Sequence, residues 1–430
     1  MSISTAIQAL QKAFPSDQLA LPDSDEYAKL NKSYLSLLQS EIRPAAILLP
    51  RNKEQVAWFV QVFKPFALSG AAHFAVRGAG QQPLPGCSNA GGGVTVDLRY
   101  ITGIEVKDGC VEVGRASPGL RVLNTLGGLS FFSFREGFIC DNVLNYEVVL
   151  ASGEIVNANA HEHTDLWRAL RGGGNNFGIV TRYDFRTFEQ GPFWGGSVYY
   201  FPPSFLTIGY SAAFAQMGGD LCMNQLYYTR EVEKPAVLEP FVSIQPQVEQ
   251  LNSMRMLSLK DAAAEQSQQS ADGIRCAYMN TTVQADAATL QAASDIYTAA
   301  LGPLKAIDGI TCSLTLQAYP VSLLEKCDIS LGMTVADGPL VSVLLLTWWK
   351  NKEDDEKIIQ TFKGVLEKID QDAASRGTAH PFKYMNYAYS FQDPISSYGP
   401  GNQEKLREVS VKYDPDGLFQ KGVPGGFKLF

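Results

Sequence analysis

The sequence has little charge, little histidine and no long apolar run. Only 19% of its 430 residues are charged, and the formal net charge is −8. An acidic chain without a basic stripe is not expected to bind nucleic acid. No apolar segment is long enough to span a bilayer, and the start "MSISTAIQAL" lacks the pattern of a signal peptide. We therefore expect an intracellular, cytoplasmic protein with no nucleic-acid or membrane partner.

Paired cysteines are also missing. The seven cysteines are scattered along the chain, and none forms a CxxC pair. This spacing argues against a disulfide framework and against a structural zinc site. His161 and His163 lie in a polar turn, where a surface role is expected, and His73 is expected to be structural. We predict reduced core thiols and no metal.

The hydrophobic pattern predicts a mixture of helices and strands in more than one domain. Residues 45–61 are typical of a strand, a turn and a helix that Asn52 caps. "YEVVLASGEIVNAN" is typical of a hairpin with Ser152 and Gly153 at its tip. Near residues 189–196 the pattern changes to aromatic strands and long helices. A buried strand is predicted at 338–349.

A glycine-rich loop, "VRGAGQQPLPGCSNAGGG" at residues 76–93, follows a predicted strand. A Rossmann loop would run directly into a helix, but Pro83 and Pro85 forbid that continuation. No GxxxxGK[ST] motif is present either. What remains is a turn, or a nest of main-chain N–H groups that holds an anion. Two further clusters, "TLGGLSFFS" and "RGGGNNFGIV", favour backbone packed against something flat or phosphate-bearing.

Five ordered segments give the chain a family resemblance. They are "RPAAILLPRNKEQVAWFV", the first glycine loop, "GGLSFFSFREGFICDNVLNYEVVLASGEIVNANA", "DLWRALRGGGNNFGIVTRYDFRTF" and "YMNYAYSFQDPISSYG" with the tail after it. The chain resembles the fungal berberine-bridge-enzyme-like FAD-linked oxidases, which have the vanillyl-alcohol-oxidase, or PCMH-type, fold. The resemblance implies an α+β protein: an FAD-binding domain from residues 1–190 and 376–430, and an inserted substrate domain of sheet and helices at 191–375.

The resemblance also implies which residues contact the cofactor, which is FAD. The expected cofactor residues are Arg77, Gly78, Ala79, Gly80, Gln81, Gln82, Gly86, Ser88, Gly127, Gly128, Ser130, Gly137, Asn142, Gly178, Val180 and Asn386. Turn capping is the competing role for Asn142. The expected substrate is an apolar small molecule of secondary metabolism, and the oligomeric state is left open.

Three tail residues are the catalytic candidates. Tyr384 is the first acid/base candidate, because a phenol can exchange a proton with a substrate. On a strand, Tyr384 and Asn386 would share one face, and Tyr387 and Tyr389 the other. Tyr389 is the second candidate, since relatives commonly carry an aspartate there. His380 is the third, with capping as its competing role.

The chain departs from the family pattern in two places that concern the cofactor. The family's loop usually reads RGGGHS, and its histidine forms a covalent bond to the flavin. This chain has Gln81 at that position, which cannot form the bond. Near residue 124 the family normally has a much longer cofactor-side segment, which carries the second tethering cysteine in bicovalent members.

Two functions remain open on these grounds. The first is a non-covalent FAD oxidase or dehydrogenase, and it is preferred because most cofactor-loop residues are retained. The second is a flavin-free, redox-neutral isomerase, dehydratase or pericyclase, such as a Diels-Alderase-like cyclase, that uses the old oxidase cleft. Enclosure of FAD must offset several kcal/mol of lost freedom, so a missing cofactor-side segment favours the second.

Overall fold

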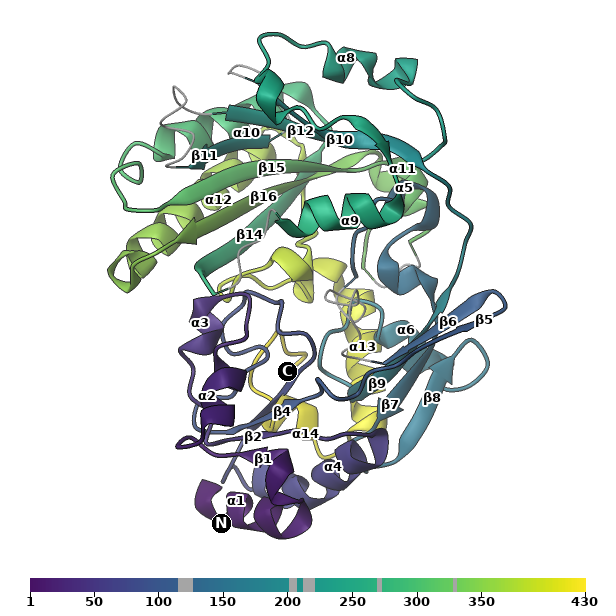
Figure 1. Ribbon diagram of the computed structural model, residues 1–430, viewed down its shortest axis with the longest axis vertical. Coiled ribbons are helices and arrows are strands. Elements are labelled where there is room, and N and C mark those ends of the chain that lie inside the picture. The colour runs from purple at the N-terminus through teal and green to yellow at the C-terminus, as the bar shows by residue number, and fades with distance from the viewer. Residues whose placement is uncertain (115–126, 201–206, 212–220, 269–272, 328–330) are drawn as a thin grey trace.

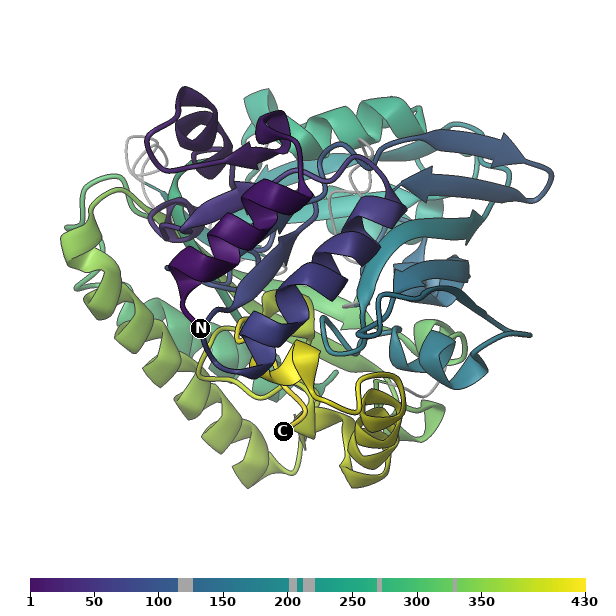
Figure 2. The ribbon, with the colours of Figure 1, turned by 90° about the horizontal axis from the view of Figure 1, so that it is seen from below.

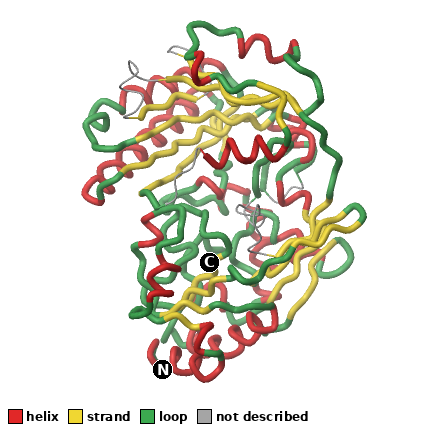
Figure 3. Tube along the Cα trace, in the orientation of Figure 1, coloured by secondary structure: helices red, strands yellow, loops and turns green. Residues whose placement is uncertain are grey.

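Three sheets organise the molecule. A computed structural model of the protein describes residues 1–114, 127–200, 207–211, 221–268, 273–327 and 331–430. In Figure 1 the largest sheet lies in the upper half and the two smaller sheets lie in the lower half. Figure 3 shows that the region between them is built mainly from loops. The candidate site residues of both glycine-rich and tail segments come from these loops.

The first sheet has four strands in the order β1-β2-β4-β3, with β2 and β3 parallel to β4. Its strands are β1 (Leu19–Ala20), β2 (Ala46–Leu48), β3 (Phe74–Arg77) and β4 (Val94–Asp97). Helix α4 (Lys53–Leu68) connects β2 to β3, and the Asn52 side chain accepts a hydrogen bond from Gln55 N, as predicted. Helix α1 (Ile3–Ala13) packs on α4. A parallel pair needs such a crossover helix, so this local pattern determines the topology.

The second sheet is antiparallel and has five strands in the order β5-β6-β9-β7-β8. Its strands are β5 (Ile104–Lys107), β6 (Cys110–Gly114), β7 (Val143–Val149), β8 (Ile155–Asn159) and β9 (Ile179–Arg186). The β7–β8 hairpin turns through Ser152 and Gly153, as the sequence predicts, and Gly153 has φ +84°. Helix α6 (Thr164–Ala169) packs on β8.

The third sheet is antiparallel and has eight strands in the order β13-β10-β12-β11-β15-β16-β14-β17. They are β10 (Phe193–Tyr200), β11 (Thr207–Ser211), β12 (Leu221–Tyr228), β13 (Arg255–Leu257), β14 (Arg275–Gln284), β15 (Thr311–Tyr319), β16 (Leu340–Trp349) and β17 (Ala379–His380). The predicted strand at 338–349 is therefore confirmed as β16. The sheet reaches residue 380, a few residues beyond the predicted domain boundary.

Two long helices, α10 (Ala287–Ala300) and α12 (Asp355–Arg376), cover one face of the eight-stranded sheet. Alternate residues of β16, Val341, Val343 and Leu345, pack against them in one buried core. The residues between them, such as Ser342 and Leu344, point to the opposite face. Asn280 of β14 lies on this opposite face, and its side chain forms hydrogen bonds with the main chain of Tyr384. The opposite face is therefore turned toward the tail.

The two chain ends build one body (Figure 2). Helix α13 (Pro400–Tyr413) packs on α6, and α14 (Leu418–Lys421) packs on α4. Phe74 N also donates a hydrogen bond to Gly422 O at 2.8 Å. The remaining helices are α2 (Asp25–Asn31), α3 (Leu37–Ser40), α5 (Ser133–Glu136), α8 (Glu239–Val242), α9 (Leu259–Gln268) and α11 (Val321–Leu324).

No described helix combines the length and the hydropathy that a membrane crossing needs.

A buried arginine joins the N-terminal body to the eight-stranded sheet. Arg275 of β14 contacts the Glu41 carboxylate with Nη1 at 2.6 Å and the Asp355 carboxylate with Nε at 2.6 Å. Its side chain is 3% exposed. Ser36 Oγ also donates to Cys276 O, and Leu37 N donates to Ile274 O beside this contact. The segment around α3 is thereby fixed against the start of β14.

We predict that Arg275→Met lowers the free energy of unfolding by about 3 kcal/mol, because it leaves two carboxylates of this contact without their partner. The matched control is Lys350→Met, since Lys350 forms an ion pair with Asp308 and both side chains are about 70% exposed. That control should change stability by less than about 1 kcal/mol. Urea unfolding of both variants measures the difference, and equal losses would contradict the assignment.

Candidate functional site

The first glycine loop presents a run of unpaired main-chain donors. In the described part of the chain, the N–H groups of residues 78–82 have no hydrogen-bond acceptor. Gly80 has φ +70°, a left-handed conformation that favours glycine. Consecutive N–H groups of this kind attract an anion without a cationic side chain. The loop therefore has the properties of the predicted nest.

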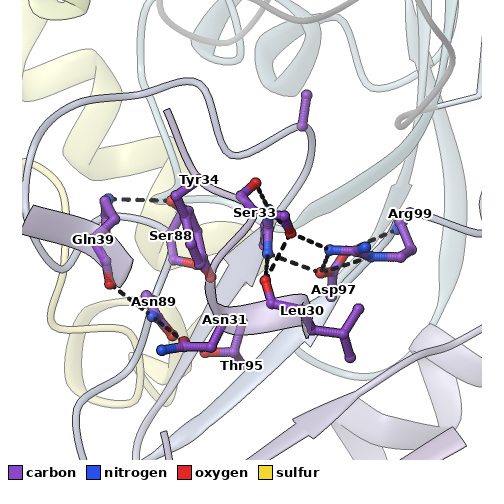
Figure 4. A network of polar contacts seen from close by, with 12 residues as sticks. Leu30, Asn31, Ser33, Tyr34, Gln39, Ser88, Asn89, Thr95, Asp97 and Arg99 are labelled. Atoms are coloured by element: carbon purple, nitrogen blue, oxygen red, sulfur yellow. Dashed lines mark hydrogen bonds and ion pairs between the residues drawn. The ribbon is translucent and has the colours of Figure 1, made fainter. Parts of the chain in front are cut away.

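The next part of the loop, residues 82–88, is held by the side-chain amide of Gln39, which lies on α3 (Figure 4). Gln39 Nε2 donates to Leu84 O at 2.6 Å and to Ser88 Oγ at 3.2 Å. Its Oε1 accepts from Gly86 N at 3.2 Å. Gly86 and Ser88, both expected at the cofactor, thus use these polar groups inside the protein. Burial raises the pKa of the neighbouring Cys87 thiol to about 12, in keeping with its predicted role as a small filler.

Two asparagines extend this polar network beneath the loop (Figure 4). Asn89 Nδ2 donates to Asn31 Oδ1 and to Gln39 O, both at 2.9 Å. Thr95 Oγ1 of β4 donates to Asn89 Oδ1 at 2.7 Å. Sequence reasoning missed Gln39, Asn31 and Asn89. Their signal is weak, because an isolated amide residue is usually exposed and nothing local marks these as buried.

Arg77 lies at the end of β3, directly before the loop, and its side chain is turned away into the protein. Nη1 donates to Leu30 O at 2.9 Å and faces Asp97 Oδ2 at 3.3 Å, and Nη2 donates to Ser33. The guanidinium also stacks on the Tyr34 ring at 3.7 Å. Arg77 thus braces the base of the loop. Its cofactor contact stays a prediction.

The second glycine loop closes on the ring of Tyr384. A Cβ at Gly127 would lie 2.9 Å from Tyr384 Cε2, so only glycine allows this approach. Gly128 N donates a hydrogen bond to Tyr384 Oη at 2.7 Å. The flat object that this loop packs against is therefore a tyrosine ring of the tail.

Tyr384 and Asn386 meet, as predicted, but not on a strand. Residues Met385–Tyr387 form a 3₁₀ turn, and Asn386 Nδ2 donates to Tyr384 Oη at 2.6 Å across it. Tyr384 N and O are bonded by the Asn280 side chain, which takes the place of a neighbouring strand. Asn386 Oδ1 is buried and has no donor facing it within the described residues.

Burial decides the charge state of Tyr384. Burial raises the pKa of its hydroxyl well above the usual value, more than the Asn386 hydrogen bond lowers it. The residue is 1% exposed. The phenol is therefore neutral near pH 7, and it begins any reaction as a hydrogen-bond or proton donor.

An aromatic series leads away from Tyr384 along the open face of the eight-stranded sheet. Tyr387 packs edge-on against Tyr384, with ring centroids 4.9 Å apart. Tyr278 lies 6.2 Å from Tyr387, and Trp348 lies 6.1 Å from Tyr278. Tyr278 and Trp348 are half-buried, so this end of the series is the more accessible one.

The other two catalytic candidates lie apart from this cluster. His380 Nδ1 accepts from Phe382 N at 3.2 Å, and Nε2 faces Asp337 at 3.6 Å. Burial lowers the pKa of His380, so its capping role fits better than proton transfer. Tyr389 packs on the core between the sheet and α12, beside Phe391, and burial raises its pKa to about 12. Neither of these side chains makes a contact with Tyr384.

The glycines of the third loop are closely packed against protein side chains. A Cβ at Gly172 would lie 2.2 Å from Leu331 Cδ2, and one at Gly178 would lie 2.5 Å from Val148 Cγ1. Asn176 Nδ2 donates to Phe427 O at 2.9 Å. Val180 lies on β9 opposite Val148 in the core. Close packing explains these glycines, and the cofactor roles of Gly178 and Val180 stay predictions.

The remaining cofactor candidates brace the turn around α5. Ser130 Oγ accepts from Phe132 N, and Gly137, with φ +84°, ends the helix. Asn142 Nδ2 donates to Glu136 O at 2.8 Å and to Phe138 O at 2.9 Å. The capping role that competed for Asn142 is therefore observed.

Two remaining points concern the expected deletion and metal binding. The position near residue 124, where the chain is expected to lack a segment, lies outside the described residues. Within the described ranges, no group of three or more His, Cys, Asp and Glu side chains could hold a metal ion.

Several curated fungal proteins of similar sequence are named FAD-dependent monooxygenases. An FAD-dependent monooxygenase from Fusarium proliferatum is 34% identical over 455 residues, which cover 92% of this chain and 87% of the relative. Another from Cochliobolus heterostrophus is 34% identical, with 91% and 86% covered. A bifunctional solanapyrone synthase from Alternaria solani is 30% identical, with 95% and 85% covered. No family model matches the chain.

The length of the first alignment bears on the missing segment. It spans 455 residues, which is more than the 430 residues of this chain. The Fusarium relative therefore has residues within the aligned region that have no counterpart here. This agrees with a deletion in this chain, and it does not place the deletion at residue 124.

Solved structures of similar fold are FAD oxidases. The structure of 6-hydroxy-D-nicotine oxidase from Arthrobacter nicotinovorans has a TM-score of 0.76 at 16% identity, covering 96% of this chain and 97% of that one. Glucooligosaccharide oxidase from Acremonium strictum, whose FAD carries a cysteinyl and a histidyl bond, has a TM-score of 0.72 at 17% identity, with both chains fully covered. These likenesses confirm the predicted α+β, PCMH-type fold.

We predict that Gly80→Ala lowers the free energy of unfolding by about 3 kcal/mol, because it adds steric overlap to a left-handed backbone. Its Cβ would lie 2.8 Å from Arg77 Nε and 3.1 Å from Tyr34 Cδ1. The control is Gly86→Ala in the same loop, with φ +80° and nothing within 4 Å of the added Cβ. That variant should lose only about 1 kcal/mol. Equal losses in urea unfolding would contradict the described packing of Gly80.

Proposed function

Because this chain belongs to the berberine-bridge-enzyme-like, FAD-linked oxidoreductases of fungal secondary metabolism, we propose that it is a non-covalent flavoprotein that oxidises an apolar small molecule. The run of unpaired N–H groups at residues 78–82 is the observation that carries the proposal. These N–H groups can donate hydrogen bonds to a diphosphate, so the loop needs no cationic side chain to bind one.

The residues present fit FAD on two counts. The N–H groups of residues 78–82 would hold the diphosphate, and Gly80 gives the loop the left-handed backbone that glycine favours. Asn386 Oδ1, buried without a donor in the described structure, would accept a hydrogen bond from a group bound beside Tyr384. A buried acceptor left unpaired costs about 1–3 kcal/mol, so a bound partner there would be stabilising. Gln81 supplies no covalent bond.

When bound, FAD supplies a two-electron acceptor for hydride taken from a substrate carbon. The chain supplies the positioning and the proton chemistry. Tyr384 Oη is fixed by Gly128 N and the Asn386 amide, which leaves its O–H hydrogen as the group free to point toward a substrate. Either donor would also stabilise the oxygen if that proton left.

The open face of the eight-stranded sheet supports an apolar, ring-containing substrate. Tyr278, Leu346 and Trp348 are half-buried on this face. Half-buried rings bind planar apolar groups well, because they offer large rigid area at low entropic cost. The absence of nucleic-acid and membrane partners and the cytoplasmic location stay predictions from the sequence.

Gln81→His tests whether the first loop still meets the flavin. We expect the variant, expressed with FAD, to retain yellow flavin after denaturation and to gain the mass of FAD. The reason is that the family's tethering histidine occupies this position. The wild-type chain should release all of its FAD under the same conditions.

The matched control is Gln82→His, which places the same side chain one residue further along the loop. We expect no covalent flavin in that variant, because its side chain leaves the backbone in a different direction. If the wild type binds FAD but the Gln81→His variant forms no covalent bond to it, this placement of the loop is contradicted.

A further inference from the structure

A row of polar side chains crosses three strands of the eight-stranded sheet, on the face that carries Tyr384. Gln317 of β15 lies directly opposite Ser342 of β16, and Ser342 lies directly opposite Thr282 of β14. Residues opposite one another in antiparallel strands point to the same side. Asn280, which bonds the main chain of Tyr384, is two residues from Thr282 and shares its face.

The oxygens of this row are enclosed and unpaired. Gln317 Oε1, Ser342 Oγ and Thr282 Oγ1 are buried, and none makes a hydrogen bond within the described residues. The hydroxyl of Tyr319, two residues from Gln317 on β15, is also buried and makes no hydrogen bond within the described residues. Thr282, Ser342 and Tyr319 are 0% exposed. Native proteins leave few buried polar atoms unsatisfied, so several in one place indicate partners that are not protein atoms.

The chemistry of the row fits water. Within the described residues none of these hydroxyls bonds its neighbour on the next strand. Each hydroxyl can both donate and accept, so one water molecule can bond two of them. Internal waters typically make about three hydrogen bonds to buried polar groups of this kind. A substrate has no access, because these atoms are enclosed.

The far end of the row is closed. His380 of β17 lies opposite Thr282, but its Nδ1 already accepts a hydrogen bond from Phe382 N. Its Nε2 is turned to Asp337. The imidazole therefore offers the row no free acceptor, and it separates the row from solvent at this edge of the sheet.

The near end of the row touches the tyrosine cluster. Burial raises the pKa of Tyr387, and hydrogen bonding from the Gln317 side chain lowers it by less. The ring of Tyr319, itself a member of the row, packs edge-on against the Tyr384 ring with centroids 6.5 Å apart. Tyr387 also packs edge-on on Tyr384, so the row begins beside the proposed proton donor.

We propose that Gln317, Ser342, Thr282 and Tyr319 form a binding site for internal water molecules, which keeps the hydroxyl of Tyr387 next to exchangeable protons. The water site stands on the register and the unpaired oxygens alone. A role of this water in proton exchange at Tyr384 rests on the proposed function. The four side chains are positioning residues, since none of them touches Tyr384 Oη in the described contacts.

Ser342→Ala tests the site against a matched control, Ser197→Ala. Ser197 of β10 is also buried with an unpaired Oγ in the described structure, but three strands separate it from Ser342. Removing a hydroxyl that binds water should lower the Tm by about 2 °C or more, whereas removing a dry, unpaired hydroxyl should leave the Tm unchanged or raise it. We expect the first result for Ser342→Ala and for the isosteric Thr282→Val, and the second for Ser197→Ala.

A crystal structure of the wild-type protein at a resolution that shows ordered water gives the second measurement. We expect water within hydrogen-bond distance of Ser342 Oγ and Thr282 Oγ1. An empty row, together with a Ser342→Ala variant as stable as Ser197→Ala, would overturn the proposal. Ordered water in a chain that binds no FAD would reject the proposed function and support the water site. A row without water in a protein that binds FAD would reject the water site and support the proposed function.

Discussion

The hydrogen bonds of the Gln39 amide are the constraint on which the candidate site depends. A loop with two prolines and several glycines has many conformations in isolation, and its ordering carries a large entropic cost. Gln39 selects one of them by bonding Leu84 O, Ser88 Oγ and Gly86 N at once. With residues 82–88 fixed in this way, the N–H groups of residues 78–82 remain unpaired and available.

The tail depends on the same principle of a side chain replacing a secondary-structure partner. Asn280 binds both the N–H and the C=O of Tyr384, which an adjacent strand would otherwise do. Tyr384 Oη then binds Gly128 N of the second glycine loop. One tyrosine therefore joins three parts of the chain that are far apart in sequence, and its hydroxyl is buried and fixed in position. Burial raises its pKa, so the hydroxyl stays protonated and can donate a hydrogen bond to a bound group.

Local patterns in the sequence predicted the elements that form by local rules. The Asn52 cap, the Ser152–Gly153 hairpin and the buried strand β16 depend on neighbouring residues only, and all three are present. The buried amides that fix the site were not predicted, because their partners are distant in the chain. The 3₁₀ turn at Asn386 and the close packing of Gly172 and Gly178 were not predicted for the same reason. In both cases the decisive contact joins residues that are distant in the chain.

In the proposed function, a nest of N–H groups holds FAD in this chain without a covalent bond. The most direct measurement is the visible spectrum of the purified wild-type protein, followed by identification of the flavin released on denaturation. We predict flavin bands and complete release of equimolar FAD. A colourless protein that gains no flavin bands when FAD is added would contradict the proposed binding of FAD.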